Sequence, residues 1–153
     1  MLDVLVYLFE NYIHEEVDEN TDEEALRVTL REAGFPDAKV DKAFDWLETL
    51  SAMHENWENL EPPASFRLYV PAEIERLDAA ARGLLLFLEQ SGVLDPVSRE
   101  LVIDRLMALD VDKIDTDHIK WVVLLVLSGR PGHEAAFDWM EVFVYDGSPG
   151  RLH

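Results

Sequence analysis

The sequence predicts an all-α protein of about seven helices, with at most one short strand near residues 66–70. Apolar residues recur at three- and four-residue spacing in every strongly patterned segment, as on one face of a helix. Capping and stop residues (Ser, Thr, Asp, Gly and Pro) separate these segments. A run of seven apolar residues, 121–127, indicates a helix that is buried on all sides.

Three helices are expected in the first third of the chain. Residues 3–17 carry an amphipathic pattern, and Thr21 with Glu24 forms a capping-box pattern that starts a second helix. Gly34 is expected to end that helix in a left-handed conformation. Asp37 then begins a third helix, whose apolar face includes Val40, Ala43, Phe44, Leu47 and Leu50.

The middle of the chain predicts two more helices after a short extended segment. Phe66, Leu68 and Val70 alternate with Arg67 and Tyr69, as in a strand or an extended arm. Pro71 is then expected to open one continuous helix up to Ser91-Gly92, in which Gly83 suggests a close helix crossing. Asp95-Pro96 opens the next helix, which carries Val97, Leu101, Val102, Leu106 and Leu109.

The apolar run is expected to be the central helix of the C-terminal part. Asp115 or Thr116 can cap its start, and Ser128-Gly129 followed by Pro131 ends it. The run is too short to span a bilayer, and no partner strand is strong enough to favour a sheet. A seventh helix follows, with Phe137, Met140 and Val144 at helical spacing.

These elements suggest a division of the chain into lobes. Residues 1–55 form an acidic three-helix lobe, and 56–65 form a linker with two prolines. Residues 66–146 form a larger helical lobe, and 147–153 form a tail.

Composition and charge narrow the classes of function. The chain has no cysteine, which excludes disulfides and thiolate sites, and its N-terminus lacks a basic signal region; we therefore expect a cytoplasmic protein with no membrane association. The formal net charge is −19, and residues 1–65 hold 17 acidic and 4 basic side chains. Such a field repels phosphate backbones and favours either basic partners or simple solubility, and a solvated acidic surface is the favoured interpretation.

No arrangement of residues predicts catalysis, a cofactor or a metal. Residues 110–121 fail as a calcium loop, because the positions that require an oxygen ligand, a glycine and a final glutamate are Ile114, Asp115 and Trp121. His14 and Asp18 lie four residues apart but lack further ligands. Nucleotide-binding loops and nucleophile motifs are absent from the sequence, so we do not expect an enzyme.

The second and third helices are arranged like a helix-turn-helix, which leaves a nucleic-acid role as the alternative. The third helix would be the recognition helix, but its polar positions carry Asp37, Asp41, Asp45 and Glu48 against Lys39 and Lys42. Direct contact with nucleic acid is therefore not expected.

The central region holds the candidate interaction residues. Arginines gather there although the chain is poor in basic residues, and Asp78 is spaced to pair with Arg82 along a helix. Either they form internal salt bridges or salt bridges to the acidic first lobe, which is the favoured interpretation, or they present planar donors to a partner. The candidates are Arg67, Tyr69, Arg76, Arg82 and Arg105.

Several long strings resemble the bacterial Smg family. They are DVLVYLFENY, RLYVPAEIERLDAAARGLLLFLEQSGVL, RELVIDRLMALD, IKWVVLLVL and PGHEAAFDWME, in that order. The resemblance implies a small, mainly helical, cytoplasmic bacterial protein, and it supplies no catalytic or cofactor residues. Genes of the family often lie beside genes for DNA-processing and translation-related proteins. We therefore expect a non-enzymatic protein that binds another protein, and its negative charge favours a basic partner. The alternative is a nucleic-acid-associated module linked to DNA processing or translation.

Overall fold

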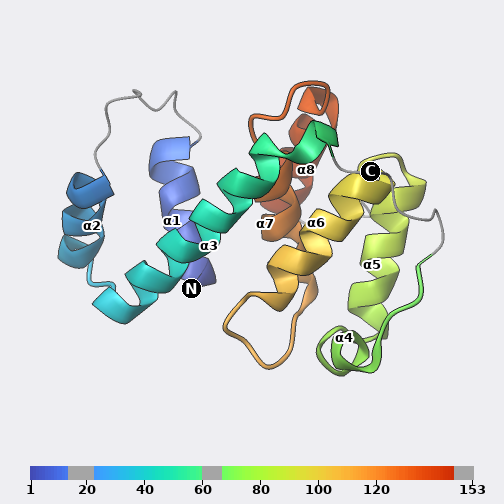
Figure 1. Cartoon of the computed structure of the whole chain (residues 1–153), viewed down its shortest axis with the longest axis horizontal. Coiled ribbons are helices and arrows are strands. Elements are labelled where there is room, and N and C mark those ends of the chain that lie inside the picture. Colours follow the sequence, from blue (N-terminus) through green and yellow to red (C-terminus); the bar gives the residue numbers. More distant parts are fainter. Residues whose placement is uncertain (14–22, 60–66, 147–153) are drawn as a thin grey trace. The chain divides into compact units, whose positions relative to one another are not determined.

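The computed structural model describes residues 1–13, 23–59 and 67–146, and within these ranges it is all-α with no strand (Figure 1). The predicted fold class is therefore confirmed. The helices are α1 (Leu2–Leu8), α2 (Glu23–Glu32), α3 (Asp37–Glu55), α4 (Pro71–Arg76), α5 (Ala79–Gln90), α6 (Pro96–Met107), α7 (Thr116–Leu127) and α8 (Glu134–Asp146), with a π-helix at Phe9–Ile13 and a 3₁₀ helix at Trp57–Asn59.

The chain forms two compact units, residues 1–51 and 52–153. Helix α3 begins in the first unit, and its last turn belongs to the second. There the backbone carbonyl of His54 accepts a hydrogen bond from Arg130 (3.1 Å). The predicted lobe boundaries at 55 and 66 stay a prediction, and the predicted tail and most of the linker lie outside the described residues.

Local contacts define the helices of the first unit. Lys39 of α3 donates to Asp3 of α1 (3.1 Å), and the ring of Tyr7 lies edge-on to Phe35 at 5.5 Å. Helix α2 ends as predicted at Gly34, whose φ of 99° is the left-handed conformation that glycine adopts without strain. The end of the predicted helix 3–17 and the cap at Thr21 lie outside the described residues.

Helix α7 is the centre of the second unit, as its apolar run predicts. Ile119 and every residue from Val122 to Leu127 are at most 2% exposed. Helices α5, α6 and α8 pack against it. Of the two predicted caps, Asp115 is the one used, since its carboxylate accepts a hydrogen bond from the His118 backbone N–H (2.9 Å).

The single helix predicted after Pro71 is wrong, because the structure divides it into α4 and α5. Leu77 is extended (φ −106°, ψ 104°), fully buried, and forms an isolated parallel β-bridge with Ile114. The Asp78 carboxylate then accepts a hydrogen bond from the Ala81 N–H (2.8 Å) and caps α5. The burial of Leu77 and the N-cap at Asp78 together compensate for the helical hydrogen bonds that the break removes.

One further expectation for this region is wrong, and the choice between a strand and an extended arm resolves to an extended arm. A Cβ added at Gly83 would meet no described atom within 4 Å, so the predicted close helix crossing is wrong. Residues 67–70 are extended without strand pairing, and their apolar side chains Leu68 and Val70 are exposed while Arg67 and Tyr69 are half-buried. Phe66, the first residue of that predicted segment, is not described.

Among the described helices, none combines the length and the apolar character that crossing a membrane requires.

Replacing Asp78 by alanine tests the break between α4 and α5. Asp78→Ala removes the N-cap of α5, and we expect the free energy of unfolding to fall by about 1 kcal/mol. Urea denaturation followed by circular dichroism measures this. Asp112→Ala, at an exposed loop position of the same unit, is the matched control; equal stability of both variants would show that the cap does not hold the break.

Candidate functional site

The five candidate interaction residues do not form one patch. Arg67, Tyr69 and Arg82 line a common pocket of about 280 Å³, whereas Arg76 lines a different pocket and Arg105 lines neither. Arg105 lies on α6, is buried, and pairs with Asp104 (2.7 Å). The remaining residues of the common pocket are Gly83, Leu86, Glu89 and Arg99.

Arg67 is held by two carboxylates. Its terminal nitrogens donate to both oxygens of Glu73 (2.8 Å each), and its Nε donates to Glu100 (2.6 Å). Burial favours the neutral form of Glu73, but the hydrogen bonds from Arg67 and the Val70 N–H outweigh it and lower the pKa of Glu73. Arg67 is therefore a structural cation and leaves no net positive charge for a ligand.

Tyr69 and Arg99 extend this network on either side of Arg67. The guanidinium carbon of Arg67 lies 5.1 Å from the centre of the Tyr69 ring, a cation–π distance. Burial raises the pKa of Tyr69, so its phenol stays neutral. Arg99, buried on α6, donates to Glu89 of α5 (2.9 Å) and lies 3.6 Å from Glu100. The network thus joins the extended segment 67–70 to α4, α5 and α6.

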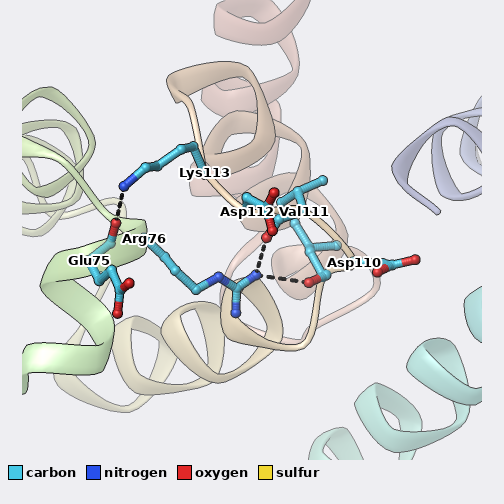
Figure 2. A pocket seen from close by; sticks show the side chains of 7 residues that line it. Glu75, Arg76, Asp110, Val111, Asp112 and Lys113 are labelled. Atoms are coloured by element: carbon cyan, nitrogen blue, oxygen red, sulfur yellow. Dashed lines mark hydrogen bonds between the residues drawn. The ribbon is translucent and has the colours of Figure 1, made fainter.

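Arg76 binds backbone rather than carboxylates (Figure 2). Its guanidinium donates to the carbonyls of Leu109 (2.9 Å) and Val111 (2.8 Å) in the loop after α6. It also donates to the carbonyl of Met107 (2.7 Å), the last residue of α6. Lys113 donates to the Glu75 carbonyl (2.6 Å) at the other side of the pocket, whose volume is about 870 Å³. Arg76 therefore caps α6 and fixes the loop that leads to α7.

Arg82 does not make the predicted pair with Asp78. Its Nε donates to the Leu77 carbonyl (3.2 Å), while the Asp78 carboxylate is used as the α5 cap. The favoured sequence interpretation, salt bridges made within the protein, fits Arg67 and Arg105, whose partners are carboxylates of the same unit. It does not fit Arg76, which binds backbone carbonyls instead. Among the described residues, no group of three or more His, Asp or Glu side chains is placed to hold a metal ion.

Sequence reasoning missed the most unusual surface of the second unit, the outer face of α5. The exposed positions of this helix carry no charged side chain, whereas exposed α3 positions include Asp41, Asp45 and Glu48. The signal was present in the run AAARGLLLFL, which holds more apolar residues than one helix face can bury. We call this face the α5 surface: Ala79, Ala80, Gly83, Leu86, Phe87 and Gln90.

Aromatic residues lie on both sides of the α5 surface. Gly83 and Leu86 line the pocket that contains Tyr69. On the other side, the Phe87 ring lies 6.3 Å from that of Trp139 on α8. Leu86 is 53% exposed, Phe87 41% and Trp139 37%. Such a contiguous group of large exposed apolar side chains is typical of binding surfaces.

The role of Arg76 is tested by removing its planar donors. Arg76→Met leaves the carbonyls of α6 and the following loop without their donor, and we expect a loss of about 2 to 3 kcal/mol in the free energy of unfolding. Arg76→Lys should restore little of it, because one ammonium cannot match the guanidinium fork. Urea denaturation measures both, with the exposed Arg31→Met as control; full rescue by lysine would contradict the capping role.

The lowered pKa of Glu73 predicts a pH dependence of stability. The unfolded state binds the proton more readily than the folded state, so the Glu73 contribution is present above the ordinary glutamate pKa and is lost as pH falls through the folded-state pKa. In Glu73→Gln we expect the free energy of unfolding to fall less steeply with acidification than in the wild type. Urea titrations from neutral to acidic pH measure the slope, and Glu75→Gln, on the exposed side of α4, is the control.

Comparison with known proteins gives the family. The whole chain, residues 1–153, matches the family described as "Protein of unknown function (DUF494)". Proteins named Smg homolog are similar over 100% of this chain and 98% of their own length: 51% identical in Thioalkalivibrio sulfidiphilus, 50% in Nitrosococcus oceani and 46% in Stenotrophomonas maltophilia. No solved structure matches the chain at a significant level. The resemblance seen in the sequence is confirmed, and the chain belongs to the Smg family.

Proposed function

We propose that this protein is a non-enzymatic adaptor that binds a protein partner through the α5 surface. One observation carries the proposal: the six exposed residues of α5 bear no charge, in a chain that is 29% charged. A solvated helix face normally carries charged residues, because these cost little to expose.

The exposed side chains have the chemistry of an interface core. Phe, Trp and Leu side chains release water when they are covered, with about 25 cal/mol gained for each Å² of apolar surface buried. Aromatic residues are enriched and charged residues are depleted at the centre of protein interfaces. Phe87 and Trp139, with Leu86 beside them, match that composition.

The network of Arg67 and Arg99 with their carboxylates holds the residues beside the α5 surface in place. Arg67 and Arg99 tie the extended segment and α6 to α5, so Tyr69 and Glu89 are positioned before a partner arrives. A preformed surface loses little conformational entropy on binding. The arginines then serve as the frame of the binding site rather than as its contact residues.

The charge of the chain favours a basic partner. A net charge of −19 accelerates association with cationic proteins and slows association with polyanions. The nucleic-acid alternative stays a prediction without a supporting contact in the described residues. The α2 arginines Arg27 and Arg31 pair with Asp41 and Asp37 of α3, and Arg67, Arg76 and Arg105 are bound as described above.

Site-specific photocrosslinking tests the proposal. A benzophenone amino acid at position 86 should yield a discrete crosslinked protein in bacterial lysate at moderate salt, because this position would lie inside the interface. The same probe at position 48, on the charged face of α3, should not yield that product.

A variant decides whether the product reports the α5 surface. Adding Phe87→Glu to the position-86 probe should abolish the crosslink, since it places a charge in the apolar contact. Circular dichroism checks that the variant remains folded, which is expected for an exposed position. A crosslink that survives Phe87→Glu, or an equal yield from position 48, would contradict the proposal.

A further inference from the structure

We infer that the α5 surface receives an amphipathic α-helix with basic flanks, supplied by the partner. This inference rests on the proposed function and adds the shape and charge of the partner to it.

The spacing of the exposed residues fits a second helix. Ala79, Gly83, Leu86 and Gln90 follow one another at intervals of four, three and four residues, which is the seam spacing of packed helices. Since α5 has 12 residues, the seam is about 18 Å long, enough for three turns of a partner.

The two halves of the seam differ in the size of their side chains. In the first half, Ala79, Ala80 and Gly83 are small, and the space above Gly83 is open. Small side chains allow helix axes to approach to about 8 Å. In the second half, Leu86 and Phe87 are large and exposed, and Trp139 lies beside Phe87. A partner helix can lie close to the first half and insert its apolar side chains between the aromatic residues of the second.

Charged side chains without an ion pair are present on α8 and on α5. Glu134 and Asp138 of α8 are exposed and make no ion pair with any described residue, and Asp138 directly precedes Trp139 in the sequence. Such carboxylates favour Lys or Arg on a partner helix that covers Trp139. On α5, the terminal nitrogens of Arg82 have no hydrogen bond among the described residues. If the carboxyl terminus of the partner helix lies beside Arg82, the guanidinium can donate to the last carbonyls of that helix. Because Arg82 is near the start of α5, this favours a partner helix that runs antiparallel to α5.

The same features disfavour a second copy of the chain as the occupant. Each copy carries a charge of −19, and a copy would bring more carboxylates to Glu134 and Asp138. A single helix face about 18 Å long and about 10 Å wide covers roughly 180 Å² in projection, well below the roughly 800 Å² per partner typical of stable protein dimers. A single helix in a groove needs less area, because a few anchor residues carry its binding energy.

Defined peptides test the inference without knowledge of the natural partner. Three fluorescein-labelled peptides of about 18 residues are compared by fluorescence anisotropy. One is an amphipathic Leu/Lys helix, one is the same pattern with Glu in place of Lys, and one has the Leu/Lys composition in scrambled order. The full chain should bind the first more tightly than either of the others.

Two substitutions at Gly83 separate docking from general charge attraction. Gly83→Gln fills the seam with a neutral side chain and Gly83→Ala leaves it nearly open, while both improve helix propensity and should preserve the fold. We expect Gly83→Gln to weaken binding of the Leu/Lys helix by about tenfold or more, and Gly83→Ala to leave it nearly unchanged.

Several results would overturn the inference. These are equal binding of the Leu/Lys helix to both Gly83 variants, equal or tighter binding of the Leu/Glu or scrambled peptide, and no binding at all. A dimer by light scattering that Gly83→Gln dissociates would instead assign the surface to a second copy. If position 86 still crosslinks a partner while the Leu/Lys helix fails to bind, the proposed function stands and the helical, basic occupant is wrong.

Discussion

The burial of residues 122–127 of α7 is the constraint on which the second unit depends. A helix that is apolar nearly all round is stable in water only when other helices enclose it. Helices α5, α6 and α8 provide that enclosure, and even Lys120 of α7 places its ammonium 4.6 Å from the centre of the Phe143 ring on α8. The surrounding helices contact α7 with their inner faces. The residues on their outer faces are therefore not determined by this packing.

The connection between α4 and α5 shows how enclosure overrides local helix propensity. A continuous helix through Leu77 would lose the bridge to Ile114, whose N–H donates to the Arg76 carbonyl at 2.9 Å. Arg76 meanwhile uses its side chain to bind the end of α6 and the loop before α7. Arg76 thus holds Ile114 through its backbone carbonyl, and the end of α6 with the following loop through its side chain. These contacts explain why the break lies directly after Arg76.

Sequence patterns predicted the features that depend on neighbours along the chain. The run 121–127, the Asp115 cap and the Gly34 terminus are local signals, and all are present in the structure. The break at Leu77 was missed because the local Asp78 cap gains its meaning only from the bridge to Ile114, which is distant in sequence. The orientation of segment 67–70 could not be predicted for a similar reason: alternation indicates two faces, but Glu73 and Glu100 decide that the face with Arg67 packs inward.

The frame of partly buried arginine–carboxylate pairs supports a binding role of the surface beside it. Replacing an ion pair inside a protein with apolar residues is often neutral or stabilising, so stability alone is a weak explanation for such pairs. In this unit they fix the position of one residue against another, as Arg67 does for Tyr69 and Arg99 for Glu89. Precise placement matters where a second molecule must fit. The uncharged α5 surface lies directly beside that frame, which is where a rigid, apolar contact area is most useful.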